Sequence, residues 1–136
     1  KMMERNGILV AGKTKLFLGT QIIAGLLLLL FGLNGFLQFL PMPPANAQMT
    51  EFTTAVYKTG YIFPLMAFFE IVTAISFLTN KYVSLMSVLI MPFMLNAFLS
   101  HIFLDMNGIA PSALIVIATI IVMVKNKESF SLIFKA

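Results

Sequence analysis

The sequence predicts an all-α integral membrane protein, folded as a bundle of four transmembrane helices. Of its 136 residues, 60% are hydrophobic and only 10% are charged, whereas about a quarter of the residues of a soluble domain carry charge. The mean hydropathy is +0.97. Four apolar stretches have lengths near the roughly 20 residues that a helix needs to cross a bilayer. No stretch alternates like a barrel strand, so helices are the remaining way to span lipid.

The four spans are predicted at residues 16–40, 61–79, 83–104 and 109–124. Residues that interrupt helices separate them: Pro41 follows the first span, Asn80 the second, and Gly108 precedes the fourth. The fourth span is the shortest at 16 residues. Lys125 can extend it to the membrane interface by snorkelling. The chain is therefore expected to form one transmembrane domain covering residues 1–136.

The segment between the first two spans is predicted to form a short amphipathic helix on the outer membrane surface. Met49, Phe52 and Val56 recur at helical spacing, while Glu51 and Lys58 lie elsewhere around the turn. A helix of this kind lies in the interface with its apolar side towards the lipid. We therefore expect it to lie on the outer membrane surface rather than to cross the membrane.

The distribution of basic residues predicts the orientation, because loops rich in Lys and Arg stay on the cytoplasmic side. With four spans, the two termini and the loop between the second and third spans share one side. That side holds eight of the nine basic residues: Lys1, Arg5, Lys13, Lys15, Lys81, Lys125, Lys127 and Lys135. The other side holds Lys58. Both termini are therefore expected to be cytoplasmic, and the net charge of +4 is explained by topology and lipid contact rather than by nucleic-acid binding.

A secretory leader is an alternative explanation of the first apolar run, because small residues around Asn46 resemble a cleavage site. The apolar core of such a leader is about 7–15 residues long. This run covers some 25 residues. We therefore expect a retained transmembrane helix.

The composition excludes several kinds of redox site within this sequence. It contains no cysteine, which excludes disulfides, thiolate metal sites and iron–sulfur ligation by cysteine. It contains one histidine, His101, so a haem cannot be held between two histidines of this chain. We expect no covalently bound cofactor, no metal site and no catalysis by this chain alone.

Polar side chains within the predicted spans are the candidate ligand-binding residues. Glu70 lies near the middle of the second span, where an ionised carboxylate costs about 2.5–3.5 kcal/mol even on lenient scales. We therefore expect it to be neutral and hydrogen-bonded. Asn34, Gln38, Asn96 and His101 fall in the same outer half of the membrane. Together they predict a polar cluster in an otherwise apolar bundle.

The alternative interpretation is that these groups only hold helices together, at about 0.6 kcal/mol for each hydrogen bond. His101 could likewise pair with Asp105 one turn later at the interface. For Glu70 a ligand-binding role is favoured, because a carboxyl group is a costly choice for helix packing. Gly25 and Gly32 lie on one face of the first span and are expected to allow close helix packing.

Several short motifs resemble the DoxX family of small membrane proteins. They are Gly-Leu-Asn-Gly-Phe-Leu-Gln-Phe-Leu-Pro-Met-Pro-Pro at residues 32–44, Thr-Gly-Tyr-Ile-Phe-Pro-Leu at 59–65 followed by Glu70, and Met91-Pro92 with Asn96 and His-Ile-Phe-Leu-Asp at 101–105. The resemblance extends from about residue 16 to 133. One departure is Gly35, where members of the family commonly carry a lysine that could pair with the carboxyl matching Glu70.

The resemblance implies a multi-pass protein of the bacterial cytoplasmic (inner) membrane that associates with redox proteins. The first functional hypothesis is that the chain is a membrane subunit that anchors a partner enzyme and helps to bind quinone through the outer polar cluster. A second is a non-catalytic structural subunit of a larger membrane complex. A small transporter with Glu70 carrying a proton is less favoured, because the four spans lack inverted repeats and broken helices.

Overall fold

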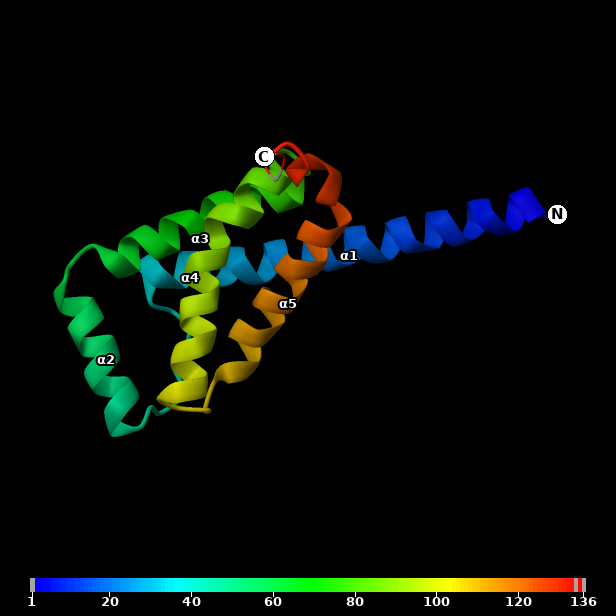
Figure 1. Ribbon diagram of the computed structural model, residues 1–136. Coiled ribbons are helices and arrows are strands. Elements are labelled where there is room, and N and C mark those ends of the chain that lie inside the picture. The colour runs from blue at the N-terminus through cyan, green and yellow to red at the C-terminus, as the bar shows by residue number, and fades with distance from the viewer. Residues whose placement is uncertain (1, 134, 136) are drawn as a thin grey trace.

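The computed structural model describes residues 2–133 and 135, with side chains described from Thr14 onwards. Lys1, and the side chains of Arg5 and Lys13, which contribute to the predicted orientation, lie outside the described part. The elements are α1 (Met2–Leu37), α2 (Ala47–Lys58), α3 (Ile62–Thr79), α4 (Val83–Phe103), α5 (Ile109–Lys125) and a short 3₁₀ helix, η1 (Lys127–Phe130). The predicted all-α fold is confirmed (Figure 1).

Three helices are long and apolar enough to cross a membrane. They are Thr14–Leu37 within α1, α3 and α4, with mean hydropathies of 2.3, 1.9 and 1.9. Within each of these, only 28–33% of the residues of the most apolar window are buried inside the protein. The remaining apolar surface needs lipid to cover it. Helix α5 is also apolar but shorter, at 17 residues. The chain is thus a multi-pass helical membrane protein.

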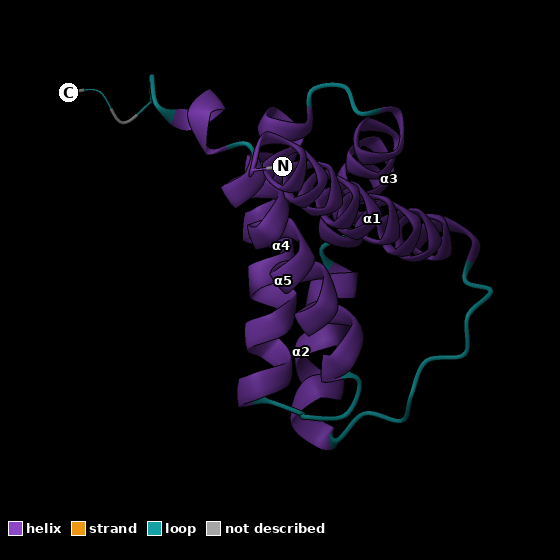
Figure 2. Cartoon of the chain, turned by 90° about the vertical axis from the view of Figure 1, so that its right-hand side faces the viewer, coloured by secondary structure: helices purple, strands orange, loops and turns teal. Residues whose placement is uncertain are grey.

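The four apolar helices form a closed ring, in which α1 contacts α3 and α5, and α4 contacts the same two helices. Figures 1 and 2 show that α1 and α3 form one pair and α4 and α5 another, and that the second pair runs across the first. The pairs lie close together near the α3–α4 turn and diverge towards the opposite end. Helix α2 lies between the diverging ends (Figure 1). We call these the turn end and the α2 end.

Glycines allow α1 and α3 to approach closely. A Cβ atom added at Gly32 would lie 2.7 Å from Cγ1 of Ile71, and one added at Gly35 would lie 2.6 Å from Cβ of Ala67. At Gly25 the nearest atom would be 3.1 Å away. Separations below 3.0 Å are hard-sphere overlaps, so the α1–α3 interface depends on the absence of side chains at the first two positions.

The turns follow from local backbone demands. Helix α1 ends at Leu37, three residues before the predicted end of the first span, because Gln38 adopts a left-handed conformation with φ 51°. Asn80 does the same after α3, with φ 55°. Gly108, with φ 79°, precedes α5. Asn and Gly tolerate this region better than other residues, which explains why these residues punctuate the spans.

The lysines near the membrane boundaries gather at the turn end. Lys81 lies in the α3–α4 turn, Lys125 ends α5 and Lys127 begins η1. Lys58 ends α2 at the opposite end. These described lysines are therefore distributed unequally between the two ends of the bundle.

Candidate functional site

Glu70 faces the interior of the bundle and is only 4% exposed. Its neighbour in sequence, Phe69, stacks on Phe93 of α4 with ring centroids 5.2 Å apart. Ala67, three residues earlier on α3, packs against α1 at Gly35. Glu70 therefore lies between the α4-facing and α1-facing sides of its helix. Its carboxyl group forms no hydrogen bond with any described residue, contrary to the hydrogen-bonded state expected from the sequence.

A second buried polar group lies one turn from Glu70 on α3. Thr73 is completely buried, and its Oγ1 atom lacks a hydrogen-bond partner among the described residues. Buried polar groups are normally satisfied, and unsatisfied ones are often found where a protein binds water or a ligand. Glu70 and Thr73 are two of several polar side chains in the bundle interior, which also include Gln21, Ser87 and Thr119. Among the described residues, the Oε1 atom of Gln21 lacks a hydrogen-bond partner in the same way as Thr73 Oγ1.

Asn34 and Gln38 are used in the local structure that ends α1. The Oδ1 atom of Asn34 accepts a hydrogen bond from the backbone N–H of Leu40 at 2.7 Å. The backbone N–H of Gln38 donates to the carbonyl of Asn34 at 2.9 Å, and the Gln38 side chain is exposed. These contacts satisfy backbone groups that a helix end leaves free.

His101 and Asp105 interact through the backbone rather than through the carboxylate. Nδ1 of His101 lies 3.1 Å from the main-chain oxygen of Asp105. The Asp105 carboxylate instead accepts hydrogen bonds from the backbone N–H groups of Asn46, at 2.7 Å, and Asn107, at 3.0 Å. These two bonds hold the pKa of Asp105 below its usual range, and the nearby His101 lowers this pKa further.

Asn46 completes a clamp between the start of α2 and the α4–α5 loop. Its side-chain oxygen accepts from the backbone N–H of Met49 at 2.9 Å and so caps α2. Its Nδ2 atom donates to the carbonyl of Leu104 at 2.6 Å. We call Asn46, Leu104 and Asp105 the α2 clamp. It fixes the position of α2 against the ends of α4 and α5, at the α2 end of the bundle.

The lowered pKa of Asp105 predicts a loss of stability in acid. A carboxylate with a lower pKa in the folded state contributes stability above its unfolded pKa and loses it as the pH falls through the folded value. Wild type should therefore have a higher Tm than Asp105→Asn near about pH 6, and this difference should shrink towards about pH 3. Thermal unfolding in detergent at both pH values tests this. A difference that does not change with pH would show that the carboxylate charge does not support the clamp.

Two polar residues of the transmembrane helices, Asn96 and Gln21, lie outside the α2 clamp. Asn96 is exposed on the outer side of α4 and forms no hydrogen bond with any described residue. Gln21, by contrast, is completely buried near the turn end, where Nε2 donates to the carbonyl of Phe77 at 2.8 Å and to Oδ1 of Asn80 at 3.0 Å. Gln21 is not among the residues predicted from the sequence to bind a ligand. Its amide within an otherwise apolar run could have indicated a buried position, because such a side chain rarely faces lipid.

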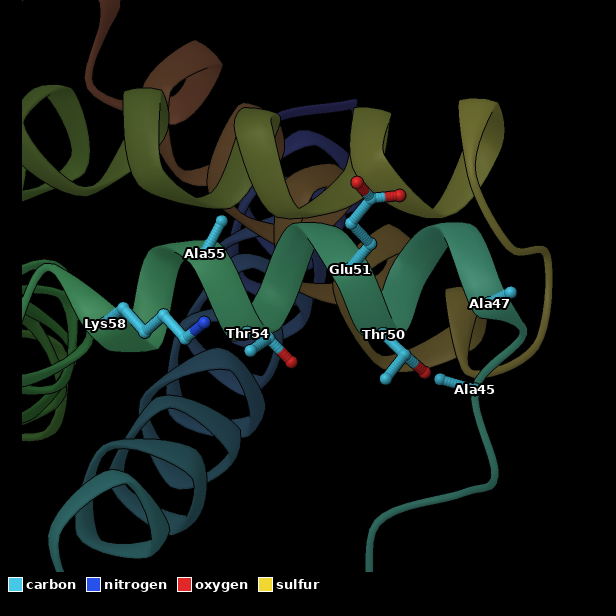
Figure 3. A pocket seen from close by; sticks show the side chains of 7 residues that line it. All are labelled: Ala45, Ala47, Thr50, Glu51, Thr54, Ala55 and Lys58. Carbon is cyan, nitrogen blue, oxygen red and sulfur yellow. The ribbon is translucent and has the colours of Figure 1, made fainter.

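Two shallow hollows on the described part of the structure are lined by none of the predicted ligand-binding residues. The larger, of about 630 Å³, lies along α2 and is lined by Ala45, Ala47, Thr50, Glu51, Thr54, Ala55 and Lys58 (Figure 3). The smaller, of about 190 Å³, is an apolar groove between α1 and α5. Among the described residues, no three His, Asp or Glu side chains come together in a way that could hold a metal ion. The quinone site expected from the sequence stays a prediction.

Comparisons with known proteins identify no family for this chain. No protein-family model, curated protein or solved structure matched the chain. In its described part, the chain is a small all-helical protein with three helices of membrane length and a fourth, shorter apolar helix.

Proposed function

We propose that this chain is a membrane subunit that anchors a water-soluble partner protein at the bilayer and presents α2 to it. The observation that carries the proposal is α2 itself: a polar helix held rigidly at one end of an apolar bundle, with an open hollow along its exposed face. A non-catalytic role agrees with the scattered positions of the polar side chains that the sequence suggested for ligand binding.

The attachment of α2 supports this proposal, because a docking surface binds more tightly when it is ordered in advance. The α2 clamp fixes its first turn through hydrogen bonds of 2.6–2.9 Å. Met49 is buried, while Phe52 and Val56 on the same side are half-buried. Gly60, with φ 75°, turns the chain directly into α3. Both ends of α2 are thus tied to transmembrane helices.

The exposed face of α2 has the chemistry of a protein-docking surface. Figure 3 shows Glu51 and Ala55 pointing to one side of α2, Thr50 and Thr54 pointing to the other, and Lys58 at the end of α2 that leads to α3. A carboxylate and an ammonium group on one exposed surface can orient a partner without strong net attraction to anionic lipid. This arrangement favours a polar protein surface with a protruding side chain over a small apolar ligand.

The positive-inside rule supports a location for this surface. The lysines at the turn end favour a cytoplasmic position for that end and for both termini. The α2 end then faces the outer side of the membrane, and the partner would bind there. The resemblance to the DoxX family implies the bacterial cytoplasmic membrane and a redox protein as the partner.

Participation in quinone binding is a second candidate function, favoured by Glu70. Its carboxyl group is buried without a hydrogen-bond partner, and a protonated carboxyl could donate to a quinone carbonyl in an apolar interior. The family's lysine is absent, and a residue larger than glycine at Gly35 would overlap Ala67. Any such site would therefore depend on Glu70 and Thr73 rather than on an ion pair with α1.

Filling the hollow should abolish partner binding. Thr54→Trp places a large side chain on the exposed face of α2 without touching the α2 clamp, so the protein should fold and insert normally. Proteins that co-purify with the wild type from native membranes, quantified by mass spectrometry, should be largely lost from Thr54→Trp. The matched control is Ile117→Trp on the exposed surface of α5, where partner recovery should be retained. Equal recovery from both variants would contradict docking on α2.

A further inference from the structure

Helix α4 carries an exposed stripe with the spacing of a two-stranded coiled coil. Its residues follow one another at alternating intervals of four and three, and all of them are exposed: Leu85, Leu89, Pro92, Asn96, Leu99 and Phe103. We call this set the α4 stripe. An alternation of this kind keeps one face of a helix towards a partner helix along its whole length. Neither α3 nor α5 covers it.

Asn96 gives the α4 stripe a chemical preference. It lies near the middle of the membrane-length helix Val83–Phe103 and forms no hydrogen bond with any described residue. Among the described residues of the membrane-length spans, it is the one exposed amide or charged side chain that lies beyond the first turn of its span. An amide facing hydrocarbon without a partner is unfavourable, whereas an amide between helices stabilises their association. No described residue of this chain therefore supplies a group that both donates to and accepts from Asn96.

We propose that the α4 stripe is the interface of a homodimer in which Asn96 pairs with the same residue of a second copy. All copies insert in one direction, so a two-fold axis along the membrane normal makes the two α4 helices parallel and sets each residue opposite its counterpart. An amide is self-complementary, because it donates and accepts at once. A single asparagine in an otherwise apolar heptad also fixes the register of two parallel helices.

The other residues of the α4 stripe also support a second copy of the chain as the partner. Leu89, Asn96 and Phe103 occupy one heptad position, and Leu85, Pro92 and Leu99 occupy the other, so the apolar side chains of Pro92 and Leu99 flank the amide along the stripe. The exposed faces of α1 and α5 carry apolar side chains, which lipid can cover without a protein partner. The inference goes beyond the proposed function, since self-association through α4 does not require any partner at α2.

Resonance energy transfer between labelled copies tests the proposal with the purified chain in phosphatidylcholine vesicles. Wild type should dimerise, and Asn96→Leu should raise the dissociation constant roughly tenfold. Asn96→Gln retains an amide and should keep much of the affinity. Leu114→Ala removes an exposed side chain from α5 and should have no effect. At a dilution in lipid at which all four proteins are monomeric, they should melt alike because Asn96 is exposed in the monomer. A monomeric wild type, or a dimer unaffected by Asn96→Leu, overturns the proposal.

Cysteine cross-linking fixes the geometry, and the absence of native cysteine makes single substitutions unambiguous. Leu99→Cys keeps Asn96 in place and should form a disulfide-linked dimer, because each copy of this residue faces its own counterpart. Ile117→Cys, exposed on α5, should not. Cross-linking at Ile117 with none at Leu99 would assign the dimer to another face and overturn the proposed interface.

Discussion

Gly32→Leu should destabilise the protein by about 1–3 kcal/mol or more, the usual effect of overpacking a close interface. A Cβ atom at this position would lie 2.7 Å from Cγ1 of Ile71 and 3.0 Å from its backbone nitrogen. The side chain of Ile71 can rotate, but the nitrogen belongs to α3, so the two helices would have to separate. That movement would also disturb Glu70, whose Cβ lies 3.0 Å from the same point. Unfolding by increasing SDS in mixed micelles measures the change.

The same helix supplies a matched control for this substitution. Gly19 lies in α1, and a Cβ atom there would meet nothing within 4 Å. Gly19→Leu should therefore leave the unfolding free energy unchanged or raise it slightly, because leucine is the better helix former. If both substitutions destabilised equally, the effect of Gly32→Leu would come from α1 alone, and the close α1–α3 contact would be wrong.

The elements of this fold are largely predictable from sequence, because their causes are local. Runs of apolar residues need lipid or protein around them, and only helices satisfy the backbone within lipid. Asn80 and Gly108 interrupt the runs since both tolerate left-handed backbone conformations. The amphipathic helix between the first two spans is likewise found as α2, with Met49 buried and Lys58 exposed. Periodicity and turn chemistry are sufficient for this level of the structure.

The partners of the polar side chains were not predictable in the same way. Asn46 and Asp105 are 59 residues apart, and Gln21 bonds the carbonyl of a residue 56 positions away. Placing five polar residues at similar depths did not determine which way each would point around its helix. Asn34 binds its own helix end, because a nearby backbone N–H is always available to an amide. Membrane depth is encoded locally, whereas contacts between helices depend on the whole packing arrangement.

Glu70→Leu should stabilise the protein by about 1–3 kcal/mol, the opposite of the usual effect of a buried substitution. Glu70 as a residue is 4% exposed, and its carboxyl group has no hydrogen-bond partner among the described residues, so the cost of removing it from water is not offset by a hydrogen bond within the protein. Leucine has a similar volume and no polar atom. Glu70→Gln, which keeps a polar group in the same place, should change stability much less. Unfolding in mixed micelles compares the three proteins directly.

Either outcome decides what Glu70 does, because a packing role and a ligand-binding role predict opposite signs. If Glu70→Leu were less stable than the wild type, the carboxyl group would have a partner in the membrane, and helix packing would account for it. If Glu70→Leu is more stable, packing offers no reason for a carboxylic acid at this position. Proteins accept such costs at functional sites. Quinone retained by the wild type after gentle extraction, and lost from the more stable Glu70→Leu, would then assign the cost to ligand binding.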